Sequence, residues 1–315
     1  MSCWPGGQHQ HTMDKATANK QYVAIALAVI AMIIWSGNFI IARDVFKEIP
    51  PISLNFYRWL TAAIIILPFA IQKIIKEWLQ VRRSWLYLAC VGLTGVALFN
   101  TFVYIGAHYT SAINLALIGT TSSPIFSVIL ARIFLNEKIG LMKIIGMILC
   151  VIGIIFLICR GSIENLLSLT FTKGDAWVLL GAITFAVYNI LVKKKPKTIT
   201  ALSFLAVTFV LGTIIMIPFF LWESAKTSSI SWDNRLVGSI IYLGLGASVI
   251  CFLIWNFSIS VLGAGRAALF GNLIPIFTSL GAVLLLNEQF TMLHVISMLL
   301  VFTGILIANL KFRKL

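Results

Sequence analysis

The residue with the clearest chemical potential is Arg58, a cation near the start of the apolar segment 53–71. A charge at such a depth in an apolar helix is costly and usually faces water, a partner or a ligand. Its guanidinium could bind a carboxylate or phosphate through two parallel hydrogen bonds. The alternatives are that Arg58 reaches back toward the nearer end of the segment or binds backbone carbonyls. Asn55 lies three residues earlier on the same helical face and adds a second polar group.

Two further amides lie beside aromatic residues in two other apolar segments. Trp35 and Asn38 share one face of the segment 22–42, while Tyr188 and Asn189 are neighbours in the segment 175–192. Both pairs could line a polar cavity. The alternative is interhelical hydrogen bonding, which amides within membranes form readily.

Aromatic and amide side chains are also paired in the segments 84–106 and 235–258. Asn100 lies one turn before Tyr104, and Asn256 follows Trp255. These four residues could form an aromatic box around a ligand, or could simply pack against neighbouring helices.

Pro124 and Pro275 each lie inside an apolar segment. Proline removes a backbone donor and kinks a helix, so both positions are candidate gates or hinges. A static bend is the alternative.

The elements that carry these residues are apolar and long. Of the 315 residues, 60% are hydrophobic and 11% are charged, a composition far more apolar than that of a soluble domain. The apolar runs show no strand-like alternation, and their lengths match the hydrocarbon thickness of a bilayer. We therefore expect an all-α integral membrane protein with ten transmembrane helices. Their predicted ranges are 22–42, 53–71, 84–106, 112–134, 141–159, 175–192, 200–222, 235–258, 264–286 and 292–310.

The formal net charge is +14, and the basic residues that produce it are distributed unevenly across the predicted membrane. Most lysines and arginines, including those in 73–83, 193–197 and 311–314, lie on the side of the membrane that holds both termini. An excess of Lys and Arg in cytoplasmic loops sets the orientation, so both termini are predicted to be cytoplasmic. The basic surplus is thus explained without nucleic acid. No catalytic constellation, phosphate-binding motif or metal cluster is visible, so we expect no enzyme, no cofactor and no metal site.

The chain contains an internal repeat. Pro-Ile-Phe occurs at 124–126 and at 275–277, and Leu-Asn-Glu occurs at 135–137 and at 286–288, both with an offset of 151 residues. Each predicted half has five spans, so the second half must enter the membrane from the opposite side to the first. The expected organisation is a polar tail 1–21, two repeats at 22–159 and 175–310, and a basic tail 311–315.

Several motifs resemble the EamA domain of the drug/metabolite transporter superfamily. They are Trp-Ser-Gly-Asn-Phe at 35–39, Phe-Tyr-Arg-Trp at 56–59, Ser-Pro-Ile-Phe at 123–126 and Leu-Asn-Glu-Lys at 135–138. The resemblance covers about 22–310 and is greatest to the ten-helix amino-acid and metabolite exporters. It implies two inverted five-helix repeats around a central cavity, and a location in the bacterial inner membrane.

On these grounds we expect a secondary transporter that exports amino acids or related small metabolites by alternating access, acting as a monomer. Apart from a small-molecule substrate and the lipid bilayer, no partner is expected. The predicted spans hold no acidic residue near their middle, so a proton relay is not favoured over facilitated diffusion or exchange. The alternatives are uptake or exchange of a cofactor-like metabolite, or a non-transporting membrane scaffold or lipid-handling protein.

Overall fold

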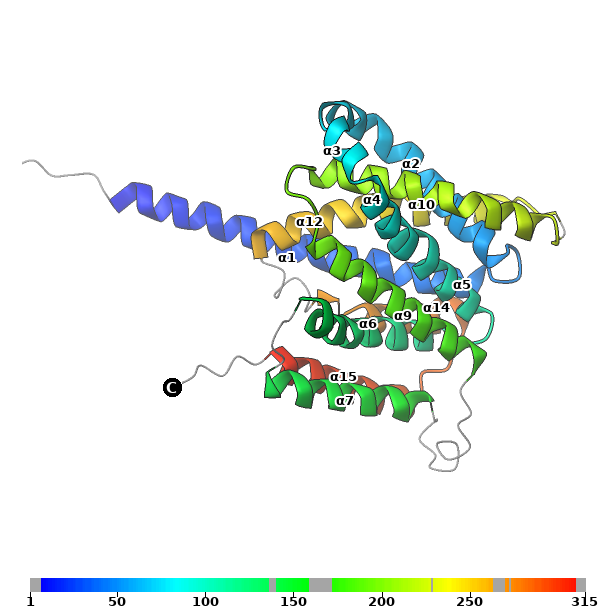
Figure 1. The fold of residues 1–315 in the computed structure, drawn as a ribbon. Coiled ribbons are helices and arrows are strands. Elements are labelled where there is room, and N and C mark those ends of the chain that lie inside the picture. The colour runs from blue at the N-terminus through cyan, green and yellow to red at the C-terminus, as the bar shows by residue number, and fades with distance from the viewer. Residues whose placement is uncertain are drawn as a thin grey trace, which may run out of the picture.

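The computed structural model describes residues 7–135, 140–158, 172–227, 229–262, 270–271 and 273–309, and this described part of the chain is helical with no strand (Figure 1). The helices of the first half are α1 Gly7–Asp44, α2 Pro51–Lys76, α3 Trp78–Arg83, α4 Trp85–Gly92, η1 Leu93–Leu98, α5 Phe99–Ala107, α6 Ala112–Leu135 and α7 Leu141–Ile158. Those of the second half are α9 Lys173–Lys193, α10 Ala201–Ser224, α11 Asn234–Ile241, η2 Tyr242–Ile250, α12 Cys251–Leu262, α14 Leu273–Leu286 and α15 Met292–Asn309.

Seven of the described helical segments are long and apolar enough to cross a membrane, and three shorter apolar helices occur at 144–156, 273–286 and 292–307. Many large apolar side chains point outward: Phe69, for example, is 72% exposed and Leu284 is 69% exposed. Such an exterior is suited to lipid rather than to water. Of the predicted tails, 311–315 lies outside the described residues.

The first helix is longer than predicted. α1 begins at Gly7, whereas the sequence reading placed residues 1–21 in a polar tail. The reason is that helix propagation beyond an established span costs little, and Ala16, Ala18 and Lys20 are good helix formers.

The two halves are interleaved rather than stacked as separate units. α1 packs against α12 and α14 of the second half, and α9 packs in the matching way against α5 and α6 of the first half. α2 packs against α10 and η2, while α10 also packs against α4 and η1. α7 and α15 pair with each other at one edge of the molecule (Figure 1). Most helices thus find their partners in the other half of the chain.

Two π-helical segments interrupt the helices predicted at 84–106 and 235–258. They are η1 and η2, and the offset of 151 residues places Leu93–Leu98 within the range of η2. A π turn changes the hydrogen-bond register of a helix and occurs often at functional sites. Residue periodicity predicts neither π segment.

A glutamate near the end of each of the helices α2 and α10 accepts hydrogen bonds from backbone N–H groups at the start of the other helix, so the two helices cap each other. Glu223, at the end of α10, accepts hydrogen bonds from the Ser53 backbone N–H at 2.6 Å and the Ile52 N–H at 3.1 Å. Glu77, just after α2, accepts a bond from the Thr200 N–H at 3.0 Å.

Burial raises the pKa of Glu77, but the hydrogen bonds from Thr200 and Ser203 and the charge of Lys73 outweigh burial and lower this pKa. The Glu77 contact therefore stabilises the fold above the unfolded-state pKa and is lost as pH falls through the lowered value.

Replacing Glu223 by Gln should destabilise the protein more than replacing Glu77 by Gln. Glu223 is only 7% exposed, and its substitution turns an acceptor oxygen into an amide donor facing backbone N–H groups. We expect a loss of about 1–3 kcal/mol for Glu223→Gln and a much smaller loss for exposed Glu77→Gln. Thermal unfolding in detergent measures both. Equal melting temperatures for the two variants would contradict the assignment of Glu223 as a buried cap.

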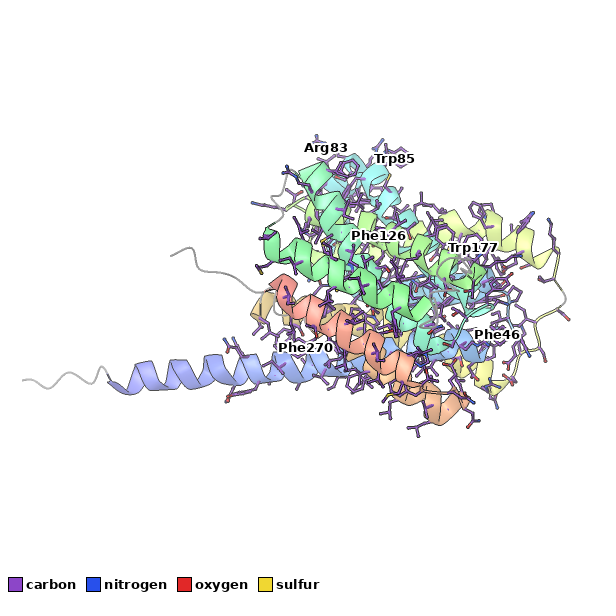
Figure 2. All side chains as sticks on the ribbon, turned by 90° about the horizontal axis from the view of Figure 1, so that it is seen from below. Phe46, Arg83, Trp85, Phe126, Trp177 and Phe270 are labelled. Carbon is purple, nitrogen blue, oxygen red and sulfur yellow. The ribbon has the colours of Figure 1, made fainter. Side chains whose placement is uncertain are left out.

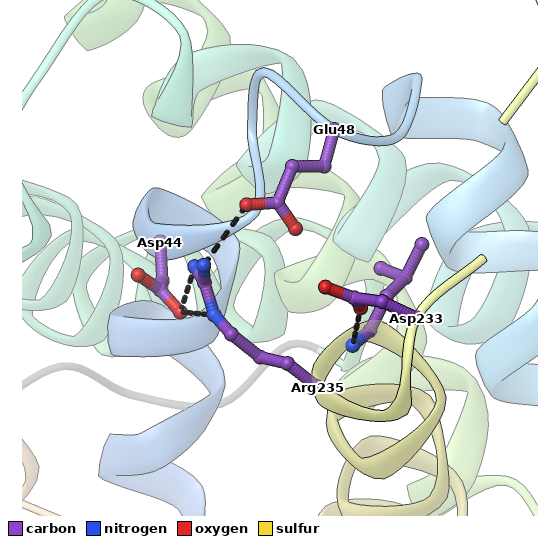
Figure 3. Close-up of polar contacts among 5 residues, drawn as sticks. Asp44, Glu48, Asp233 and Arg235 are labelled. Carbon is purple, nitrogen blue, oxygen red and sulfur yellow. Dashed lines mark hydrogen bonds and ion pairs between the residues drawn. The ribbon is translucent and has the colours of Figure 1, made fainter. Parts of the chain in front are cut away.

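A surface ion-pair cluster connects the α1–α2 loop to α11 (Figure 3). Arg235 lies 2.7 Å from the Asp44 carboxylate and 3.1 Å from that of Glu48. The Asp233 side chain accepts a hydrogen bond from the Leu236 N–H at 2.7 Å and caps α11. Because these groups are partly exposed, the cluster positions the loop more than it stabilises the fold.

Candidate functional site

Arg58 on α2 is the centre of a buried polar cluster. Its Nη1 donates hydrogen bonds to Asn38 Oδ1 at 2.6 Å, Asn100 Oδ1 at 2.8 Å and Tyr104 OH at 2.7 Å. Its Nε donates to Ser248 Oγ at 2.9 Å. Tyr104 in turn donates to Asn38 Oδ1 at 2.8 Å. All five side chains are at most 5% exposed, and they come from α1, α2, α5 and η2.

The positive charge of Arg58 has no carboxylate partner among the described residues. Within the described part of the chain, its hydrogen-bond acceptors are neutral oxygens, and Arg58 reaches them through Nη1 and Nε rather than through Nη2. A buried cation without a counter-charge is expensive unless another group neutralises it. The arrangement is therefore suited to an anionic oxygen that approaches the free edge of the guanidinium.

Aromatic rings lie beside the cluster. The Arg58 Cζ lies 5.0 Å from the centroid of the Trp59 ring, a distance at which a cation is attracted to the π face. Trp59 packs edge-on against Phe252, and Trp35 contacts both Phe252 and Trp255, with centroids 5.8 and 5.5 Å away. Trp35 and Trp255, predicted separately, are therefore close together.

Asn55 and Trp35 bind the backbone of the π segments instead of completing the Arg58 cluster. Asn55 Nδ2 donates to the carbonyls of Val96 at 3.1 Å and Ala97 at 3.0 Å, both in η1. Trp35 Nε1 donates to the carbonyl of Ala247 in η2 at 2.8 Å. Val96 and Ala247 are related by the repeat offset of 151 residues. The backbone carbonyls at equivalent positions of the two π segments thus each accept a hydrogen bond from a side chain of another helix.

Asn55→Leu should destabilise the fold without changing the Arg58 cluster. The substitution removes the donor to two carbonyls at a site with no exposed surface, and each buried unsatisfied group costs about 1–3 kcal/mol. Thermal unfolding should report a lower melting temperature, while the protein that remains folded should transport normally. A variant as stable as the parent would contradict this role for Asn55.

The predicted pair Tyr188 and Asn189 lies away from Arg58. Asn189 Nδ2 contacts Ser127 Oγ at 3.3 Å, which joins α9 to α6. The Tyr188 ring stacks on Phe185 with centroids 5.4 Å apart and packs against Gly95 of η1. Among the described residues, no hydrogen bond or ring contact joins either residue to the Arg58 cluster.

Asn256 and its neighbour Trp255 differ in exposure. Asn256 is exposed, whereas Trp255 is partly buried against Trp35. Successive residues of a helix point about 100° apart, so adjacency in sequence does not by itself place both on one face. The aromatic box shared by Trp255 and Asn256 stays a prediction.

The two prolines lie in different local settings. Pro124 is inside α6, as expected for a kink. Pro275, in contrast, is the third residue of α14. The N–H groups of a first turn have no intrahelical acceptor, so proline is tolerated at that position. The role of either proline as a gate or hinge stays a prediction.

Ser248 and Trp59 are the contacts of Arg58 that the sequence analysis missed. Ser248 Oγ also donates to the carbonyl of Leu243, five residues earlier, at 2.9 Å. This i to i−5 bond belongs to the π register, which no periodicity argument had revealed. The signal in the sequence that points to Trp59 is the Phe-Tyr-Arg-Trp motif at 56–59, of which it is the last residue.

The fold and the buried polar centre together define a helical, multi-pass membrane protein, and comparison with known proteins gives its family. The profile of the EamA-like transporter family matches residues 22–159 and 172–310, so the chain belongs to that family. An uncharacterized transporter of Archaeoglobus fulgidus is 27% identical over 90% of this chain and 96% of its own length. The uncharacterized transporter YyaM of Bacillus subtilis is 28% identical over 92% of this chain and 94% of its own length.

A likeness to a solved structure supports the fold alone. One crystal structure superposes with a TM-score of 0.63 at 14% identity and covers 91% of this chain and 96% of its own. The relatives are named as transporters, and the family model matches the chain twice, once in each half.

Proposed function

We propose that this EamA-family protein is a secondary transporter that exports amino acids or related small metabolites, and that Arg58 binds the anionic group of the substrate. The observation that carries the proposal is the buried guanidinium, which among the described residues has no carboxylate partner and no hydrogen bond from Nη2. A carboxylate could accept hydrogen bonds from Nη2 and neutralise the charge. Export rather than uptake comes from the resemblance to ten-helix exporters.

The proposed transport cycle depends on an inverted repeat with ten spans. In this proposal α7, α14 and α15 cross the membrane along with the seven longer segments, and each half has an odd number of spans. The reciprocal caps support this arrangement, because each of α2 and α10 begins where the other ends. Rocking of the two interleaved halves would then expose Arg58 to each side in turn. Both termini face the cytoplasm of a cell whose inner membrane holds the protein.

The direct test is a metabolite-flux measurement. Bacterial cells that overproduce the protein, and matched cells carrying an empty vector, are profiled by mass spectrometry in both medium and cytoplasm. We expect one class of carboxylate-bearing metabolite to accumulate outside the producing cells and to fall inside them. Loading membrane vesicles with that metabolite then measures its efflux directly.

Three outcomes separate this proposal from its rivals. Faster efflux of an anionic metabolite supports export, and faster uptake of the same class would retain the site but reverse the direction. If no metabolite changes in cells or vesicles despite a folded, membrane-inserted protein, the transporter function is wrong. A scaffold or lipid-handling role would then be tested instead.

A further inference from the structure

One end of the molecule carries an exposed surface rich in both cations and aromatic rings, which we name the basic-aromatic patch. It covers the end of α2, the short helix α3 and the start of α4. In Figure 2, Arg83 and Trp85 lie together at this end of the molecule. The exposed members of the patch are Lys73, Ile75, Lys76, Trp78, Leu79, Arg82, Arg83, Trp85 and Leu86.

The apolar members of the patch have no protein covering them in the described structure. Trp78 is 58% exposed, Leu79 is 55% exposed and Trp85 is 62% exposed. α2 and α4 belong to two of the segments long and apolar enough to span a membrane, and the patch lies where these segments end. Tryptophan is enriched at the boundary between hydrocarbon and headgroups because its ring is amphipathic.

The cations of α3 lie directly beside its apolar side chains. Arg82 follows Trp78 by four residues and Arg83 follows Leu79 by four, so each guanidinium shares a helical face with an apolar neighbour. This spacing allows the apolar groups to enter the acyl boundary while the guanidinium groups reach the phosphates above it.

A second basic segment is held next to the patch. Glu77 binds the Thr200 N–H, and the Tyr87 hydroxyl donates to the carbonyl of Leu191 at 2.7 Å. These contacts position the loop between α9 and α10, whose sequence Lys-Lys-Lys-Pro-Lys occupies 193–197. Glu77 is the only acidic residue in 73–86 and 193–200, and its carboxylate is bonded to Thr200. The charge of the whole surface is therefore strongly positive.

We propose that the basic-aromatic patch is a binding site for acidic phospholipids of the leaflet that borders it. The phosphodiester headgroup is held by the cations, and the tryptophans anchor the neighbouring glycerol and acyl region. A lipid is favoured over a soluble acidic protein because the patch lies at the ends of two membrane-spanning segments, where lipid headgroups are already present.

Native mass spectrometry of the detergent-purified protein, titrated with phosphatidylglycerol or phosphatidylcholine, tests the proposal. The key variant is Arg82→Gln with Arg83→Gln. The matched control, Lys47→Gln with Lys226→Gln, removes two cations at the other end, where Glu223 binds the start of α2. Each cation near a membrane surface contributes about fivefold to the binding of anionic lipid, so phosphatidylglycerol should bind about 30-fold more weakly to the key variant. The control should bind it as the wild type does, and phosphatidylcholine should bind weakly to all three.

Three outcomes would overturn the proposal. Equal affinity of wild type and key variant for phosphatidylglycerol would overturn the site, as would an equal loss in the control. Complete displacement of the lipid by millimolar inorganic phosphate would indicate a simple anion site and would also overturn the lipid assignment. Since the substituted side chains are exposed, circular dichroism should show unchanged helicity in both variants.

Discussion

Arg58→Ala is expected to lower transport by roughly 100-fold or more at subsaturating substrate. The substitution removes two charge-assisted hydrogen bonds to the proposed substrate anion, which together contribute about 3–4 kcal/mol. Arg58→Lys retains the charge but lacks the planar, forked geometry, so its transport should be intermediate. The measurement is the initial rate of efflux from vesicles that contain equal amounts of each protein.

The control for this prediction is another arginine with a backbone partner. Arg43 donates from Nη1 to the carbonyl of Ala107 at 2.7 Å but lies at the end of α1, away from the polar cluster. Arg43→Ala should leave the efflux rate within about twofold of the wild type, because it removes one neutral-acceptor bond outside the site. Folding is checked by monodispersity in detergent. If folded Arg58→Ala protein transports as fast as the Arg43→Ala control, the guanidinium is not part of the substrate site.

Gly244→Ala is expected to impair both stability and transport. A Cβ at this position of η2 would lie 2.6 Å from the Thr61 Cβ and 2.9 Å from the Arg58 carbonyl oxygen. Backbone atoms of α2 would have to move away from η2, which costs about 1–3 kcal/mol and shifts Arg58 from Ser248. We expect a lower melting temperature and a transport rate reduced at least tenfold, since small misplacements of a binding group have large effects.

Gly238→Ala provides a matched control in the preceding helix. No atom lies within 4 Å of a Cβ at Gly238, and alanine is the better helix former. This variant should be as stable as the parent or more stable, with normal transport. A double variant, Gly244→Ala with Thr61→Gly, removes the nearest clash and should recover part of the activity. Unchanged stability in Gly244→Ala would show that α2 and η2 are not tightly packed in the membrane.

The apolar segments and the internal repeat could be predicted from the sequence because both depend on the identity and spacing of residues. The apolar segments follow from hydropathy, and the repeat follows from one constant offset. Arg58, Asn38, Asn100 and Tyr104 are candidates because they are polar or aromatic residues within apolar segments, and the structure brings their side chains together.

The remaining features depend on side-chain direction and hydrogen-bond register, which composition does not encode. Trp35 and Asn55 were expected at the site, but their donors are committed to the carbonyls of Ala247 and Val96. Those carbonyls need side-chain donors because η1 and η2 are π segments, and nothing in residue spacing distinguishes a π segment from an α-helix here. Ser248 was missed for the same reason.

Interleaving of the two halves has a consequence for biosynthesis. The ribosome releases α1 and α2 first, yet their packing partners α10, η2, α12 and α14 are among the last elements to be made. The early helices must therefore remain in the bilayer with lipid as their temporary neighbour until synthesis is almost complete. Assembly cannot proceed one half at a time, and a chain that is truncated within its second half leaves its earliest helices without many of their native contacts.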